Sequence, residues 1–295
     1  MSGRYAKAPL IYMTAKIKTT PLPNLTSDQW ALIEQLMVKN GLPEKVTSKV
    51  KEISFNASNE SSQEESPVST SYVNRHGFFS ADRSNALIIE KDGIEWRTSS
   101  YIRYAFVCEK FQQILEALCE QISAYQFVPT QELSLSYVDL IAPIGNRTLS
   151  EYFSNSDKIL PLSAITGSEK DLQNFGLLQI NRIVEPNKRI FISLDQLPVI
   201  EGRPSRFLPQ NMMEPDNKLS MPLKLRDEWS NILLNHYALL TTQAALLTNT
   251  SLKDLKFQDA CKPIHSLTRE TFKGLINKEV CDIDWEYITD GSQGA

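Results

Sequence analysis

The stretch "ELSLSYVDLI" at residues 132–141 has the clearest structural pattern in the 295-residue chain. Successive side chains of a β-strand point to opposite faces, so its residues divide into two sets. One face carries Leu133, Leu135, Tyr137, Asp139 and Ile141, and the other carries Ser134, Ser136, Val138 and Leu140. The first face is the more apolar one, although Asp139 lies on it. We therefore expect a strand within a sheet, with one carboxyl group on its apolar side.

The chain around this stretch contains further runs with the composition of strands. They cover residues 9–17, 48–55, 72–81, 86–91 and 94–98 before it, and residues 177–183 and 189–195 after it. Turn sequences, "DRSN" and "DG", separate the runs between residues 72 and 98, and this arrangement is typical of an antiparallel meander. The connection "VEPNK" favours a hairpin between the last two runs.

Helices are expected where apolar residues recur at helical spacing. The first begins after Thr26 or Ser27, either of which is a good N-terminal cap, and ends near Gly41. Further helices are expected at residues 103–122, 226–247 and 261–276. Together with the strands, this order of elements predicts an α+β fold, in which helices pack on a mainly antiparallel sheet.

The length of the chain allows either one continuous domain or two related α+β halves. The halves would be residues 1–145 and residues 146–290, the second of which ends in long helices. Residues 56–71 are rich in Ser, Glu and Asn and contain almost no apolar side chains. We expect them to form a flexible or disordered surface loop, because they lack the apolar area that would offset the entropy of ordering.

Composition and charge narrow the class of protein. With 41% hydrophobic and 22% charged residues, the chain resembles an average globular protein, and its net charge of -4 argues against nucleic acid as the partner. The four cysteines contain no C-x-x-C pair, so we expect buried, reduced thiols. Lys16 interrupts the N-terminal apolar run before a signal sequence or a membrane span could form. These features predict a cytoplasmic protein that is not bound to a membrane.

Four segments carry a resemblance to a known family. They are "YAKAPLIY" near the start, "ELSLSYVDLIAP" in the middle, "ISLDQL" later and "IHSLTRETFKGLI" near the end. The chain resembles the sporadically distributed, uncharacterised bacterial family with a Y-x-x-A-P-[IL] start, an R-Y-I-N-like middle strand and an H-x-x-x-x-x-x-F terminal helix. It departs from that pattern at Ser136 and Asp139, where the family has Arg and Asn. The resemblance implies an α+β fold and a bacterial or phage cytosolic source, and it brings no catalytic residue.

His265 is the first candidate for a functional side chain. It lies in the expected C-terminal helix, beside an apolar line formed by Ile264, Leu267, Thr271 and Leu275. The favoured interpretation is a packed ring that donates its N–H to a nearby acceptor. A ligand or base role would need a carboxylate or a second histidine from elsewhere in the chain. Tyr137 and Asp139, on the apolar face of residues 132–141, are further binding candidates.

Arg97 and Arg103 are the remaining binding candidates. They belong to the run "WRTSSYIRY", in which aromatic and basic residues alternate as they do at some nucleic-acid surfaces. The start of a helix that covers a sheet explains the same residues without any ligand, and this interpretation is favoured. The expected partner is therefore another protein rather than a nucleic acid, and the long helix at residues 226–247 is one place where it could bind.

No motif points to a reaction. The chain has no G-x-G-x-x-G, Walker loop or G-x-S-x-G elbow, and its histidines lack metal-ligand spacing, so we expect no cofactor, no metal and no assigned catalytic residue. The first functional hypothesis is a non-enzymatic binding or accessory protein in a bacterial conflict, defence or regulatory locus. The alternative is a metal-dependent hydrolase or nuclease whose distant carboxylates, such as Asp139, Asp195, Glu201 and Asp216, converge in the fold.

Overall fold

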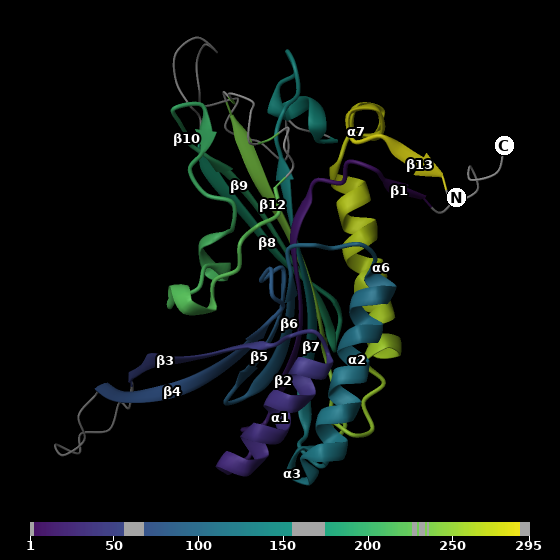
Figure 1. Ribbon diagram of the computed structural model, residues 1–295. Helices are drawn as coiled ribbons and strands as arrows, with labels where there is room; N and C mark the ends of the chain where they lie inside the picture. The colour runs from purple at the N-terminus through teal and green to yellow at the C-terminus, as the bar shows by residue number, and fades with distance from the viewer. Residues whose placement is uncertain are drawn as a thin grey trace, which may run out of the picture.

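A computed structural model describes residues 3–55, 68–154, 175–225, 229, 234 and 236–289, and within them a nine-stranded sheet forms the centre of the molecule (Figure 1). Its strands lie in the order β3-β4-β5-β6-β2-β7-β12-β9-β8, and every neighbouring pair is antiparallel. Helices pack on this sheet, so the predicted α+β class is confirmed. The first strand of the sheet to be synthesised, β2, is not at an edge but between β6 and β7.

The strands of this sheet have the following bounds. They are β2 (Leu10–Thr19), β3 (Glu44–Phe55), β4 (Val68–Phe79), β5 (Asn85–Glu90), β6 (Gly93–Thr98), β7 (Thr130–Ile141), β8 (Gly176–Glu185), β9 (Lys188–Leu197) and β12 (Tyr237–Leu247). Two small two-stranded sheets pair β1 (Gly3–Tyr5) with β13 (Tyr287–Thr289) and β10 (Val199–Ile200) with β11 (Arg203–Pro204). The predicted meander corresponds to β4, β5 and β6, and the predicted hairpin to β8 and β9.

The helices have equally clear bounds. They are α1 (Ser27–Lys39), α2 (Tyr104–Gln121), α3 (Ser123–Gln126), α6 (Phe257–Leu275) and α7 (Lys278–Asp284), with 3-10 turns η1 (Leu149–Tyr152), η3 (Gln210–Met212) and η4 (Asn217–Leu219). The predicted ends of the first helix are confirmed. Thr26 accepts a hydrogen bond from the Gln29 N–H and the Gln29 side chain accepts one from Thr26, while Gly41 has a φ of 80° just past the end.

The largest hydrophobic core lies between the sheet and the helices α1, α2 and α6, which cover one face (Figure 1). Leu135 of β7 is fully buried there, together with Phe111 of α2 and Phe257 of α6, whose ring centroids are 4.8 Å apart. This helix-covered face therefore corresponds to the apolar side of the alternating stretch at residues 132–141.

The opposite face of the sheet is covered by much less chain. Residues 199–225, drawn in green in Figure 1, cross it and pack Val199, Leu208 and Met221 against Val138 and other apolar residues near one end of the strands. The middle of this face carries polar side chains, as described below. We call it the open face.

The prediction of a helix at residues 226–247 is wrong for its second half. Residues 237–247 form β12, which pairs with β7 on one side and with β9 on the other. Its sequence, "YALLTTQAALL", is apolar on nearly all sides because both faces of β12 are buried, and such a run matches a buried strand as well as a helix. Residues 226–228, 230–233 and 235 lie outside the described residues.

Two predictions about organisation can be compared with the positions of the strands. The predicted boundary between residues 145 and 146 falls between β7 and β12, and these strands pair with each other, so both segments contribute to one sheet. Residues 56–67 of the predicted loop lie outside the described residues. Residues 68–71 were expected in that loop, but they form the beginning of β4 and pair with β3.

Candidate functional site

The centre of the open face is polar because four adjacent strands place polar residues at matching positions. Thr14 of β2 pairs with Arg97 of β6 on one side and with Ser136 of β7 on the other. Ser136 in turn pairs with Gln243 of β12. Residues that are paired across strands point to the same face, so the register brings these side chains into one row. Two residues further along β2, Lys16 pairs with Glu95 of β6 and continues the polar area.

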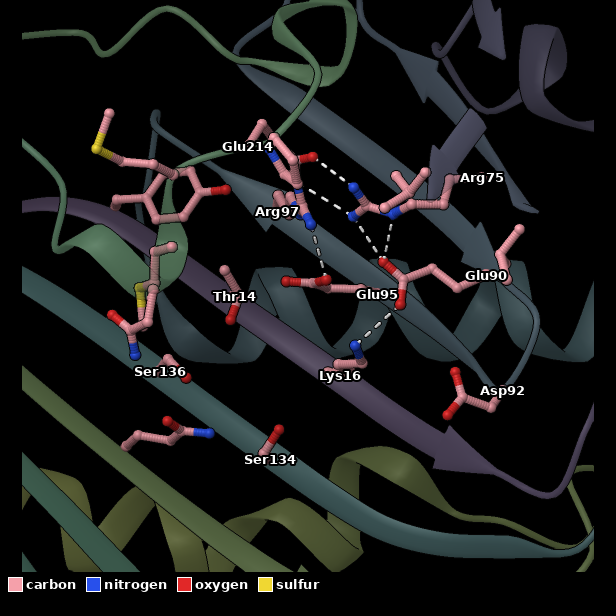
Figure 2. Close-up of a pocket in the computed structure, with 18 of the residues that line it drawn as sticks. Thr14, Lys16, Arg75, Glu90, Asp92, Glu95, Arg97, Ser134, Ser136 and Glu214 are labelled. Atoms are coloured by element: carbon pink, nitrogen blue, oxygen red, sulfur yellow. Dashed lines mark hydrogen bonds and ion pairs between the residues drawn. The ribbon is translucent and has the colours of Figure 1, made fainter. Parts of the chain in front are cut away.

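These residues form the floor of a pocket of about 510 Å³ (Figure 2). Arg75 of β4 and Glu90 of β5 stand at one side, and residues 211–215, from the segment that crosses the open face, stand at the rim. The pocket has the size of a site for a small molecule or for one or two side chains of a partner. It lies on the side of the sheet away from the helices.

Ion pairs connect the charged residues of the pocket (Figure 2). Arg75 donates to Glu90 through Nε and Nη2, at 2.8 and 2.6 Å from Oε1, and through Nη1 to Oε2 of Glu214 at 2.5 Å. Arg97 donates to Glu95 at 3.0 Å and also to Glu214. Glu214 therefore bridges two arginines that belong to different strands.

Neighbouring charges hold these groups in their ionised forms. Burial alone would raise the pKa of Glu90, but the positive charges of Lys16 and Arg75 outweigh it and lower that pKa. Burial also opposes the charge on Arg97, yet the carboxylate of Glu95 and other neighbours raise the pKa of Arg97 well above its ordinary value. The pKa of Lys16 is raised in the same way by Glu95 and Glu90, against the effect of burial. Glu90, Arg97 and Lys16 are therefore charged around neutral pH.

The floor of the pocket contains polar groups that bind no other side chain or backbone group among the described residues. Within the described part of the chain, the side chains of Thr14, Ser134, Ser136 and Gln243 have no hydrogen-bond partner, although they line the pocket. The Nε atom of Arg97 is buried and also has none among those residues. Unsatisfied donors and acceptors are costly inside a protein, so such a group at a pocket floor is available to an incoming ligand.

A second group of polar residues lies under the helices. It includes three of the candidates predicted from the sequence, Tyr137, Asp139 and His265. The ring of His265 in α6 stacks on Tyr104 of α2, with centroids 3.8 Å apart and planes inclined by 2°. Its Nδ1 lies 3.0 Å from the Tyr137 hydroxyl of β7. Both contacts are made with tyrosine side chains, and the packing role of His265 stays a prediction. The fully buried residues of α6 are Phe257, Cys261, Ile264 and Thr268, so the buried line begins earlier than expected.

Burial shifts the pKa values of this cluster in opposite directions. The pKa of His265 falls to about 4 because its ring is buried and because Arg269 lies nearby. The pKa of Asp139 rises to about 8 through burial, and within the described residues its carboxyl group has no hydrogen-bond or ion-pair partner. At neutral pH the histidine is therefore uncharged and the aspartic acid is mostly protonated.

The remaining sequence candidates do not form one site. Arg97 lies in the pocket, whereas Trp96 is buried in the core beneath the helices and Arg103 is exposed just before α2. The run "WRTSSYIRY" is consequently divided between the two faces of the sheet. Of the five predicted binding residues, Tyr137 and His265 are in contact, Asp139 lies on the same face, and Arg97 and Arg103 stand apart from them.

The carboxylates proposed for a hydrolytic site are also separated. Asp139 and Asp195 are opposite Leu240 and Leu239 of β12, so they point to opposite faces of the sheet. Asp195 binds Arg206 at 3.2 Å, and Asp216 accepts a hydrogen bond from Ser48 at 2.6 Å. Within the described residues, no group of three or more His, Cys, Asp or Glu residues is arranged to hold a metal ion.

Two further sequence predictions can be compared with the structure. All four cysteines are buried and unpaired, as predicted. In the part of the chain that the structure describes, no helix is long and apolar enough to cross a membrane.

Comparisons with known proteins add no assignment. The chain matches no family model, and no curated protein matches it in sequence.

Most residues of the pocket were not predicted. A usable signal existed in the polar residues at every second position inside apolar strands, such as Thr14 and Lys16 or Ser134 and Ser136. This spacing indicates one polar face. The contribution of Glu214 had no comparable signal, because it lies in a Pro-rich segment without periodicity.

Proposed function

We propose that this chain is a non-enzymatic binding protein and that the pocket on the open face is its binding site. The observation that carries the proposal is the set of fixed charges around a floor of unused hydroxyl and amide groups. General acid–base catalysis needs a group whose pKa lies near the working pH. The pocket instead offers permanent charges and neutral hydrogen-bonding groups, which suit recognition.

The proposed ligand belongs to another protein. The resemblance to the sporadically distributed bacterial family remains part of this proposal, and it favours a cytoplasmic accessory role in a conflict, defence or regulatory locus. The net charge of -4 disfavours nucleic acid, and the pocket itself is balanced. Lys16, Arg75 and Arg97 are matched there by Glu90, Glu95 and Glu214.

The test is capture of a partner from the native host by the purified chain and by two matched variants. Ser136→Trp places a large ring on the pocket floor, so it should prevent stoichiometric capture. Ser266→Trp makes the same substitution at an exposed position of α6, on the other side of the sheet, and should leave capture unchanged. Thermal unfolding of both variants would verify that they are folded.

Two results would contradict the proposal. One is equal capture by wild type and by Ser136→Trp, which would place binding elsewhere. The other is metal-dependent turnover on a panel of nucleotides and nucleic acids, lost in Ser136→Trp but not in Ser266→Trp. That second result would instead support the hydrolase alternative.

A further inference from the structure

Glu214 differs from the other charged residues of the pocket in the kind of chain that carries it. Arg75, Glu90 and Arg97 are held on strands of the sheet, whereas Glu214 lies between the short turns η3 and η4. Its carboxylate nevertheless lies between the two arginines (Figure 2), and its side chain is only 8% exposed. The segment thus inserts one carboxylate into a site that the sheet has already built.

Arg75 and Arg97 would form a binding position for a carboxylate even without Glu214. Arg75 retains Glu90 as a partner, and Arg97 retains Glu95, so both guanidinium groups are oriented by residues of the sheet. Each then directs an Nη atom at the same point, where Glu214 accepts from both. Paired guanidinium groups of this kind recognise carboxylates strongly and with defined geometry.

The segment is held on both sides of Glu214. Towards the C-terminus, Asp216 accepts a hydrogen bond from Ser48 and Leu219 is fully buried. Towards the N-terminus, Met212 packs against the apolar cluster of the open face. Met213 is 53% exposed between these anchors. Residues 213–215 therefore form a short stretch between two anchored parts of the segment.

Withdrawal of Glu214 would change the charge of the pocket. With Glu214 in place, the three cations Lys16, Arg75 and Arg97 face three carboxylates, and without it they face two, Glu90 and Glu95. The position between Arg75 and Arg97 would then carry an excess positive charge. Among the described residues, the buried Nε of Arg97 and the hydroxyl of Thr14 have no hydrogen-bond partner, and both residues line the pocket. An anionic group with further polar atoms would satisfy all of these.

We propose that the pocket recognises an acidic side chain of the partner protein and that Glu214 occupies the place of that side chain in the unbound protein. This inference rests on the proposed binding function and specifies its ligand. The present occupant is itself a glutamate on a peptide segment that crosses the rim, which favours a peptide ligand over a free anion. An internal carboxylate competes at a high effective concentration and so weakens binding of an external one.

The experiment measures binding of N-acetyl-glutamate amide by isothermal titration calorimetry, with N-acetyl-glutamine amide and inorganic phosphate as comparison probes. Glu214→Ala should bind the glutamate probe at least ten times more tightly than the wild type does. The glutamine probe should not bind, because it lacks the charge. Adding Arg97→Met to Glu214→Ala should abolish binding of the glutamate probe.

A second variant guards against loss of folding. Glu214→Gln keeps the size and shape of the side chain but removes the charge, and its amide nitrogen cannot accept from an arginine, so it should also bind the glutamate probe more tightly than wild type. Equal affinity of wild type and both variants would overturn the proposal. Tight binding of phosphate without binding of the glutamate probe would overturn it as well, since the site would then select a free anion.

The result is separable from the test of the proposed function. If Ser136→Trp prevents capture of a partner but Glu214→Ala gains no affinity for the glutamate probe, the pocket binds a partner by other chemistry. If the probe binds as expected but capture does not depend on Ser136, Arg75 and Arg97 bind a carboxylate, and the partner binds elsewhere.

Discussion

The two faces of the sheet are built from the same strands and are used in opposite ways. In β7, Leu135 faces the helices and is fully buried in the main core, while its neighbour Ser136 faces the pocket and has no side-chain partner among the described residues. The helix-covered face is filled by packing. The open face leaves its central polar groups available. A single alternating strand therefore contributes to stability with one set of residues and to recognition with the other.

Two buried aspartates sharpen this comparison. Asp195 is on the open face, where Ser193 and Arg206 bind its carboxylate. Asp139 is on the helix-covered face, where no described residue binds it. An unpaired buried carboxyl group avoids the cost of desolvation by keeping its proton. The open face thus accommodates charge, whereas the helix-covered face tolerates an acid only in its neutral form.

The largest expected effect is on stability when the helix-covered face is emptied. Phe111→Ala removes a fully buried ring that packs on Phe257, and it should lower the free energy of unfolding by about 3 to 5 kcal/mol. Ser136→Ala, on the open face, should change it by less than about 0.5 kcal/mol, because that hydroxyl has no partner among the described residues. Urea denaturation of both variants measures the difference. Similar losses would show that the two faces are not divided as described.

The second effect concerns pH. The carboxyl group of Asp139 is ionised above about pH 4 in the unfolded chain but keeps its proton up to about pH 8 in the folded protein. The folded state binds more protons in this window, so stability falls as the pH rises through it. His265 has the opposite effect, because its lowered pKa of about 4 makes stability fall as the pH drops below about 6.5.

These two contributions cancel between about pH 4 and pH 6.5, and only that of Asp139 remains above. Between pH 6.5 and pH 8, wild type should lose about 2 kcal/mol that Asp139→Asn does not lose. Chemical denaturation at the two pH values, with both proteins side by side, measures this. Parallel pH dependence in wild type and in the variant would mean that Asp139 is ionised in the folded protein.

A smaller effect than that of Asp139 is expected at His265. His265→Gln loses the stacking on Tyr104 but keeps a polar group near the Tyr137 hydroxyl, so it should cost about 1 kcal/mol. Tyr137→Phe removes only the hydrogen bond and should cost about the same or less. Thermal melting and partner capture should be measured together. A fully stable His265→Gln protein that no longer captures its partner would show that the histidine belongs to a binding site.

The sequence predicted the framework better than the site. Alternation and turn residues were sufficient for the strands from β4 to β7, and the cap at Thr26 was sufficient for the start of α1. Prediction failed at β12 because a strand that is buried on both faces loses its period of two. Tyr137 and His265 are 128 residues apart, and both were named from local patterns. Tyr137 lies on the apolar face of residues 132–141, and His265 lies beside the apolar line of its helix.

The pocket was beyond prediction for a different reason. Arg75, Arg97 and Glu214 come from separate parts of the chain, and their ion pairs depend on the strand order rather than on local spacing. Arg97 was named as a candidate, but with Arg103 as its expected companion. One of its actual partners, Glu95, lies two residues away on the same strand and face, whereas the other, Glu214, comes from a segment without periodicity.

The strand order has a consequence for the protein while it is being synthesised. Strand β7 is complete at residue 141, but its partner β12 ends only at residue 247, so the nascent chain carries β7 as an unpaired edge for about a hundred residues. At typical rates of translation this interval lasts roughly 5 to 20 s. Strand β1 remains without its partner for longer still, because it pairs with β13 at residues 287–289. A chain released early would therefore expose a ready template for mispairing with other nascent chains.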